Sequence, residues 1–352
     1  MPRVLLFTGC VNQPLSYARA PSGQGIASFF VDPDTGAAEP GPVCTDIVNP
    51  TFVALSGDGS KLAAISETED RAEDLLSLFE VNAATGELTL LGRQSTRGSV
   101  ACHCAFDAAG TMVATANYTA GSNPAGNAIS LHRLEAGVPS VSLTDIVHTG
   151  SGPNAARQER SHAHCVRWTP DQRYIAVVDL GIDSVRLYRA ADFSLASETK
   201  LPGGSGPRHI AFHPNKPLAY VMAELQPGVT TLGYANGTFE ILATHAVEPA
   251  VSGGSGIVVA PGGTHLFVGD RGNKAVARFA IDPVSGVATF AGTTPSGGDV
   301  ARDLAFGANG KLLAVANVGS DVVQLFSHGS DGTLTPLSRI ATGTPTAVAF
   351  LG

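Results

Sequence analysis

The chain has 352 residues, with 41 glycines, 22 prolines and only 15% charged residues, and its net charge of −8 argues against nucleic acid or an anionic membrane as partner. No apolar run is long enough to span a membrane, and the run in MPRVLLFTGC is too short for a secretory signal. Because its five cysteines are scattered rather than arranged as a disulfide framework, we expect a cytoplasmic protein.

A unit of short apolar strands separated by turns recurs along the chain. In each copy a first strand passes through an Asp-, Asn-, Gly- or Pro-rich turn into a second strand. These turns are SGDGSK (56–61), DAAGTM (107–112), TPDQRY (169–174), HPNKPL (213–218), APGGTH (260–265) and GANGKL (307–312). A third and a fourth strand follow, joined in several copies by hairpin-type turns such as ATGEL (84–88) and ANGTF (235–239). No helical period is sustained, so the sequence predicts an all-β protein.

The seventh copy of this unit is divided between the two ends of the chain. Residues 3–40 supply a second and a third strand without a first, whereas the C-terminal TPTAVAFLG supplies a first strand with nothing after it. We therefore expect 344–351 to pair with 3–9, which closes a ring and removes exposed sheet edges. The sequence predicts a single domain, residues 1–352, folded as a seven-bladed β-propeller with four-stranded blades.

The start of each first strand and the exit from each second strand share one face of a propeller. We name the first set the start positions: Thr51, Cys102, His164, Arg208, Ser255, Arg302 and Thr346. The second set, the exit positions, is Cys10, Glu67, Tyr118, Leu180, Glu224, Arg271 and Val318. Charged groups gather in these sets although the chain is poor in charge. This distribution predicts a shared pocket, the alternative being a polar rim without a specific ligand.

One hairpin, Gly203 to Glu224, places two of these charged residues side by side. Arg208 begins its first strand and Glu224 follows its second, and neighbouring strands lie ~4.8 Å apart. We expect the guanidinium and the carboxylate to share one edge of the sheet.

The stretch GSGPNAARQERSHAHCVRW (150–168) is rich in candidate binding residues. Its Gly/Pro/Asn-containing loop brings Arg157, Gln158, His162 and His164 to the same face, and loops on a rigid scaffold often carry binding residues. The H-x-H pattern on a strand would place both rings on one side, where they could ligate zinc or copper together with a nearby cysteine. Neighbouring arginines would repel a cation, however, so we expect neither a metal nor a cofactor.

Without a metal, His164 is the candidate general base, because an imidazole with a pKa near 6.5 is partly free at neutral pH. Glu224 is expected to orient water or an arginine, since a neighbouring guanidinium lowers the pKa of a carboxylate. Arg208 and Arg271 can hold an anionic substrate or a developing oxyanion. The candidate catalytic residues are His164, His162, Glu224, Arg208 and Arg271. The candidate substrate-binding residues are Arg157, Gln158, Glu67, Arg302 and Asn117.

Three segments also carry a resemblance to a known family. RQERSHAHCVRWTPDQRYIAVVDLGIDSVRLYR (157–189), GGSGPRHIAFHPNKPLAYVMAEL (203–225) and GDRGNKAVARFAI (269–281) resemble the lactonase family of seven-bladed propellers, which includes bacterial 6-phosphogluconolactonase and fungal carboxymuconate cycloisomerase. The resemblance implies a metal-independent site. Its residues would be His162 or His164, Arg208, Glu224 and Arg271. Gly-Asp-Arg-Gly replaces the Ser-Asn-Arg-Gly that is common in the family, which leaves the substrate open.

These observations favour a lactonase that hydrolyses an anionic sugar lactone, with 6-phosphogluconolactone as the first candidate. One alternative is a cycloisomerase acting on a carboxymuconate-type diacid, and another is a propeller that binds a ligand without turnover. The expected partner is a small anionic molecule, and the expected assembly is a monomer or a weak homodimer.

Overall fold

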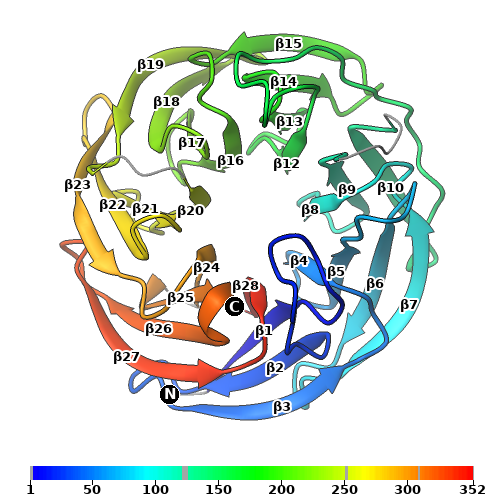
Figure 1. Cartoon of the computed structure of the whole chain (residues 1–352), viewed down its shortest axis with the longest axis vertical. Helices are drawn as coiled ribbons and strands as arrows, with labels where there is room; N and C mark the ends of the chain where they lie inside the picture. Colours follow the sequence, from blue (N-terminus) through cyan, green and yellow to red (C-terminus); the bar gives the residue numbers. More distant parts are fainter. Residues whose placement is uncertain (1–2, 121–125, 250–252, 308–309, 352) are drawn as a thin grey trace.

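The computed structural model describes residues 3–120, 126–249, 253–307 and 310–351. Their strands form seven antiparallel sheets of four strands each, and these sheets stand like blades around a central axis (Figure 1). The predicted all-β fold, a seven-bladed propeller, is therefore confirmed. Among the described residues, no helix is long and apolar enough to cross a membrane.

Each blade runs from an inner strand beside the axis to an outer strand at the rim. In that order, blade 1 contains β28 (Pro345–Leu351), β1 (Val4–Cys10), β2 (Ile26–Val31) and β3 (Ala38–Cys44). Blade 2 contains β4 (Pro50–Leu55), β5 (Lys61–Ser66), β6 (Leu75–Val81) and β7 (Leu88–Ser95). Blade 3 contains β8 (Ala101–Phe106), β9 (Met112–Asn117), β10 (Ile129–Glu135) and β11 (Val138–Pro139). Blade 4 contains β12 (Ala163–Trp168), β13 (Tyr174–Asp179), β14 (Ser184–Arg189) and β15 (Leu195–Lys200).

Blade 5 contains β16 (Pro207–Phe212), β17 (Leu218–Ala223), β18 (Gly228–Ala235) and β19 (Thr238–Ala246). Blade 6 contains β20 (Gly254–Val259), β21 (His265–Asp270), β22 (Ala275–Ile281) and β23 (Ala288–Pro295). Blade 7 contains β24 (Ala301–Phe306), β25 (Leu312–Asn317), β26 (Val322–His328) and β27 (Leu334–Ala341), with a 3₁₀ turn, η2 (Val318–Ser320), after β25.

The ring closes where the two ends of the chain meet in blade 1. Strand β28 pairs antiparallel with β1, in a register that places Leu5 opposite Leu351 and Gly9 opposite Ala347. Figure 1 shows these strands, red and dark blue, side by side in one blade. The predicted pairing of the terminal segments is thus confirmed, and it leaves no unpaired edge between the first and last blades.

Every innermost strand carries a β-bulge near its beginning. The register of pairing with the second strand shifts at each start position, and in blade 6 it skips both Ser255 and Gly256. A bulge leaves one residue out of the ladder and re-aims its side chain. The residue just before the inner strand has a positive φ in six blades, including the β-branched Val100 (54°) and Val300 (61°). The bulge is thus common to all seven inner strands, and the positive φ to six of them.

A repeated backbone hydrogen bond holds each second-strand exit against the start of the first strand. The N–H of Glu67 donates to Asn49 O (3.0 Å), and that of Glu224 donates to Gly206 O (2.7 Å). Equivalent bonds involve Tyr118, Leu180, Arg271 and Val318. In blade 1 the bond is made by Val11, because Cys10 pairs with Pro345 as Ser66 pairs with Pro50 in blade 2. The exit position of blade 1 is therefore Val11, and the prediction of Cys10 was wrong by one residue. This contact brings the two sets of positions together on one face.

The core lies between adjacent blades rather than along the axis. The cluster between blades 3 and 4, for example, joins Leu131 and Ile129 of one sheet to Val177 and Ile175 of the next, all buried. Fully burying such a side chain contributes roughly 1.5–3 kcal/mol. Because the packing is between blades, the axis is left free for polar groups and cavities.

Candidate active site

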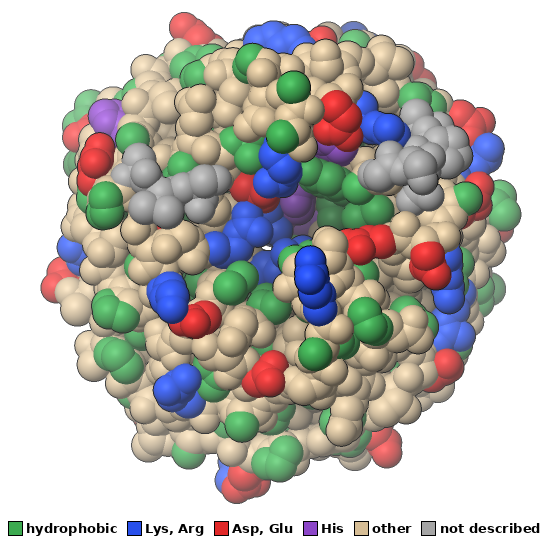
Figure 2. Space-filling view, in the orientation of Figure 1, with side chains coloured by type: hydrophobic (Ala, Val, Ile, Leu, Met, Phe, Trp, Pro, Cys, Tyr) green, Lys and Arg blue, Asp and Glu red, His purple; other side chains and the backbone are tan. Residues whose placement is uncertain are grey.

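A pocket of about 340 Å³ lies on the axis, on the face where the inner strands begin. Figure 2 shows it as a central hollow in which basic, acidic and histidine side chains gather. Its polar lining consists of Ser16, Tyr17, Glu67, Glu69, Cys102, Tyr118, Arg157, His164, Arg208, Glu224, Arg271 and Arg302. The start and exit positions thus supply most of the pocket's ionisable groups, from blades 2 to 7.

Glu224 is the anchor of this pocket. Its carboxylate faces the guanidinium groups of three arginines: Arg157 at 2.6 Å, Arg271 at 2.9 Å and Arg208 at 3.1 Å. Burial of this side chain, which is 6% exposed, would by itself raise the pKa of Glu224. The charges of Arg271 and Arg208 outweigh burial and hold the pKa well below its usual range. Glu224 is therefore a fixed anion that orients arginines, and it is too weakly basic to remove a proton from water.

Arg208 and Arg271 are held in place from more than one side. The Nη1 of Arg208 lies 3.2 Å from the ring Nε2 of His209, and burial, followed by the charges of Arg271 and Arg302, lowers the pKa of Arg208 to about 10. Arg271 donates from Nε to Gly253 O (3.0 Å) and from Nη2 to Gly254 O (3.1 Å), both at the start of β20. Each guanidinium is oriented before a ligand arrives.

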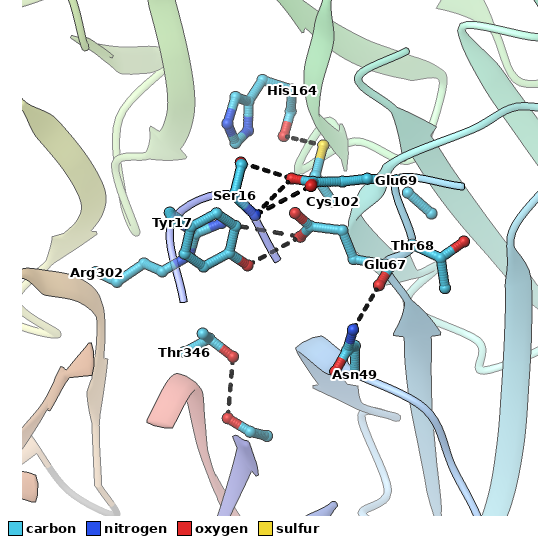
Figure 3. Close-up of polar contacts among 12 residues, drawn as sticks. Ser16, Tyr17, Asn49, Glu67, Thr68, Glu69, Cys102, His164, Arg302 and Thr346 are labelled. Carbon is cyan, nitrogen blue, oxygen red and sulfur yellow. Dashed lines mark hydrogen bonds and ion pairs between the residues drawn. The ribbon is translucent and has the colours of Figure 1, made fainter. Parts of the chain in front are cut away.

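Arg302 differs from the other three arginines in its pairing. Its nearest carboxylate oxygen, on Glu67, is 3.8 Å away, while its guanidinium carbon lies 4.1 Å from the centre of the Tyr17 ring. Figure 3 shows Arg302 beside Tyr17, with Tyr17 in turn donating to Glu67 (3.3 Å). A guanidinium stacked on a ring keeps its N–H groups available for another acceptor. Arg302 is thus the arginine with the weakest internal ion pair in the pocket lining.

The loop between β1 and β2 forms one wall of the pocket, and sequence reasoning missed it. Ser16 donates from both its backbone N–H (3.0 Å) and its hydroxyl (2.6 Å) to Glu69, which clasps this loop to the one after β5 (Figure 3). This places Tyr17 over Arg302. The length of this loop could have revealed it in the sequence. Residues 11–25 separate the second and third strands here, whereas four residues separate them in blades 4 to 7.

His164 lies in the pocket as the bulge residue of β12, with 6% of its surface exposed. Its ring meets those of Tyr118 and His209 edge-on, with centroid distances of 5.4 and 5.5 Å, and its Nδ1 is buried without a hydrogen-bond partner. Burial and the neighbouring Arg208 hold the pKa of His164 well below 6.5. The pKa is therefore lower than the ordinary value expected from the sequence, which favours the neutral imidazole.

Three predicted site residues do not line the pocket. His162 stacks on Tyr118 (4.2 Å) and uses Nδ1 and Nε2 to bind Tyr118 O and Glu159. Gln158 donates to Leu180 O. Each is buried and holds the 150–162 loop in place.

Asn117 is the third of these residues. Its Nδ2 donates to Thr96 O and Asn127 O, so the amide holds two backbone segments together and is not directed at the pocket.

The H-x-H pattern does not produce the geometry expected for a metal site. The bulge at His164 interrupts the two-residue alternation that would have put both rings on one side, and both ring nitrogens of His162 already have protein partners. In the part of the chain that the structure describes, no group of three or more His, Cys, Asp or Glu side chains is placed to hold a metal ion.

The protein is thus a closed seven-bladed propeller whose axial pocket combines four arginines with three glutamates. Comparison with known proteins identifies the protein family. Residues 8–350 match the family described as lactonase, 7-bladed beta-propeller, and the chain belongs to this family, as the sequence motifs indicated.

Several proteins that resemble this chain are named as lactonases. The chain is 32% identical over 341 residues to the 6-phosphogluconolactonase of Bacillus subtilis (strain 168), covering 93% of this chain and 95% of that protein. A crystal structure from Bacteroides uniformis, of a candidate 6-phosphogluconolactonase, superposes with a TM-score of 0.91 at 28% identity over the whole of both chains. The periplasmic gluconolactonase of Pseudomonas aeruginosa gives a TM-score of 0.89 at 25% identity, with 99% of each chain covered.

Proposed function

We propose that this protein hydrolyses an anionic sugar lactone, with 6-phosphogluconolactone as the leading substrate. The observation that carries the proposal is the arginine cluster: three guanidiniums share Glu224, while Arg302 has no carboxylate oxygen closer than 3.8 Å among the described residues. Such a pocket favours a ligand that brings its own negative charge. The names of the Bacillus subtilis and Pseudomonas aeruginosa relatives support a lactone as that ligand.

In the proposed reaction, the phosphate of the substrate binds Arg302 and the lactone carbonyl points toward Arg208. Water adds to the carbonyl carbon while its proton passes to His164, and the carbonyl electron pair moves onto the oxygen, where Arg208 stabilises the charge. Collapse of this intermediate re-forms the carbonyl and breaks the ring C–O bond. The departing alkoxide takes the proton from His164, so the products are one hydroxy acid and the unchanged enzyme.

The low pKa of His164 fits a base that must be free of its proton before each turnover. Burial and Arg208 weaken its basicity, and Glu224, whose negative charge favours the imidazolium, opposes them only in part. The proposed role of Glu224 is therefore electrostatic. It holds Arg157, Arg208 and Arg271 in position and stabilises the protonated His164.

The direct test is to follow the loss of 6-phosphogluconolactone in the presence of the purified protein and to subtract the spontaneous rate. We expect clear acceleration, a fall in kcat of about 10²–10⁴-fold in His164→Ala, and little change in the control His265→Ala, which lies on β21 outside the pocket. Arg302→Met should raise KM by at least about tenfold for the phosphorylated lactone and far less for gluconolactone. Absence of acceleration with either lactone would refute the proposal. A muconate absorbance assay on the same sample tests the cycloisomerase alternative.

The cytoplasmic location inferred from the sequence stays a prediction, because one structural relative is named as periplasmic. A phosphorylated substrate would place the protein where sugar phosphates occur. The specificity ratio between the phosphorylated and the plain lactone therefore bears on location as well.

A further inference from the structure

A second and larger cavity, of about 700 Å³, occupies the opposite end of the axis. The arginine pocket is formed where the inner strands begin, and this cavity is formed where the same strands end. The two cavities share no lining residue. Its most prominent feature is a collar of aromatic side chains: Phe52, Phe106, Trp168, Phe212, Phe306 and Phe350.

A chain of ring contacts runs from the lining of one cavity to the lining of the other. The imidazole of His103 stacks on Phe52 with a centroid distance of 4.0 Å and meets His209 edge-on at 5.2 Å, and His209 in turn meets His164 at 5.5 Å. His103 is fully buried, and His209 is 5% exposed. Packed rings thus lie between the two cavities on the side of blades 2 to 5, and the two linings have no residue in common, so the second cavity is a site of its own.

Arg167, on β12, is the sole Lys or Arg in the lining of this second cavity. Among the described residues its guanidinium forms no ion pair with a carboxylate, and its Nε is buried without a hydrogen-bond partner, with the Cys165 thiol as a close neighbour. A partly buried guanidinium without a counter-ion is costly, and an anion would offset that cost.

The two carboxylates in the same lining are already engaged elsewhere. Asp303 accepts a hydrogen bond from the backbone N–H of Val348 (3.1 Å), and Asp107 accepts from the backbone N–H groups of Thr111 (2.7 Å) and Met112 (2.9 Å). The bond to Asp303 joins blade 7 to blade 1, and the bonds to Asp107 stabilise the hairpin turn of residues 107–112. Neither carboxylate forms an ion pair with Arg167, although Asp303 is close enough for the two charges to attract, so the guanidinium can still pair with a ligand.

We propose that this second cavity binds an amphipathic organic anion, specifically a carboxylate attached to an aromatic ring. The carboxylate pairs with Arg167, for which a bidentate guanidinium–carboxylate contact is the favoured geometry. The ring lies against the aromatic collar, where offset or edge-on contacts between rings add to burial of apolar surface. The site is independent of the lactone pocket and of its proposed reaction.

The chain provides its own probe, because Trp168 is its sole tryptophan and lies in the collar. Phenylpropionate titrated into the intact protein should change the Trp168 emission in a saturable way, with the affinity measured by calorimetry. Phenylpropanol, which keeps the ring but lacks the charge, should bind at least about tenfold more weakly. Phenylpropylamine should bind more weakly still.

Variants locate the binding. Arg167→Met should weaken phenylpropionate at least about tenfold while leaving lactone turnover unchanged. Arg302→Met, in the other pocket, and Arg186→Met, whose partly buried guanidinium pairs with Glu198 outside both cavities, should leave phenylpropionate binding intact. Equal affinity for the acid and the alcohol, a loss in Arg302→Met rather than Arg167→Met, or no saturable binding would each overturn the proposal. The comparison of acid with alcohol on the unaltered protein holds even if Arg167→Met fails to fold.

Discussion

At the residue scale, the site is organised by one carboxylate shared among three guanidinium groups. Glu224 has 6% of its side chain exposed, and Arg208 has 3%. Breaking such a buried network by removing the central charge leaves uncompensated cations, which is more damaging than the loss of a surface pair. The arginines lower the pKa of Glu224, whereas burial, followed by the charge of Arg208, lowers the pKa of His164.

Glu224→Gln keeps the shape of the side chain and removes its charge. We expect the free energy of unfolding to fall by about 3 kcal/mol, because Arg208 and Arg271 would be left buried beside one another. Urea unfolding at neutral pH measures this. The control is Glu198→Gln, whose carboxylate pairs with Arg186 and Lys200 at 28% exposure, and it should cost less than about 1 kcal/mol. Equal costs would contradict the role given to Glu224.

The pH dependence of the reaction follows from the lowered pKa of His164. A base is active in its deprotonated form, and here that form predominates until the pH falls well below 6.5. After subtraction of the spontaneous rate, kcat/KM for gluconolactone, which carries no phosphate that titrates near pH 6, should therefore stay flat from pH 8 to pH 6. An inflection near 6.5 would instead indicate an ordinary, solvated histidine as the base.

At the element scale, two local devices build the pocket. The bulge at the beginning of each inner strand re-aims one side chain, and the backbone hydrogen bond from each exit position fixes a second side chain next to it. The loop of residues 11–25 then adds Tyr17 above Arg302. The first two devices recur with the blade repeat, whereas the loop occurs once.

The Tyr17 ring should matter more than its hydroxyl. Tyr17→Phe keeps the ring that stacks on Arg302 and loses a 3.3 Å hydrogen bond to Glu67, so KM for the lactone should change by less than about threefold. Tyr17→Ala removes the stacking and frees Arg302 to approach Glu67. That change should raise KM by about tenfold with a smaller effect on kcat. If both variants behave alike, Tyr17 does not position Arg302.

Sequence predicts the site residues that repeat with the blades better than those on loops found in one blade. Arg208 and Glu224 could be placed together from sequence, because their spacing repeats with the blades. Gln158 and Asn117 could not be assigned correctly, since an amide that binds backbone inside a loop looks the same in sequence as one that faces a ligand. Tyr17 was missed because its loop belongs to one blade and has no counterpart to compare.

At the scale of the whole molecule, blade count and ring closure could be predicted because turn motifs recur at regular intervals and the incomplete terminal copies complement each other. The depth of the axial cavities could not be predicted from the sequence. It depends on bulges and ring packing, which leave no period in the sequence. Blade 3 also departs from the average, since its outer strand β11 spans two residues.

The seam of the ring predicts how stability responds to pH. Asp303 in blade 7 accepts the N–H of Val348 in blade 1, and burial raises its pKa to about 6 from 3.8. Between these values the folded state binds the extra proton, so this group makes the protein less stable as pH rises toward 6 and above. Asp303→Asn mimics the protonated form. The free energy of unfolding of Asp303→Asn minus that of the unaltered protein should therefore increase by about 2–3 kcal/mol from pH 4 to pH 8. A difference that stays constant over this pH range would contradict the raised pKa of Asp303.

The central claim is that the arginine-lined axial pocket binds and opens an anionic sugar lactone. The most direct measurement is a crystal structure with the hydrolysis product, 6-phosphogluconate, bound. We expect the phosphate within hydrogen-bond distance of Arg302, and the new carboxylate between Arg208 and His164. A product molecule bound outside this pocket, or one whose carboxylate lies away from both Arg208 and His164, would contradict it.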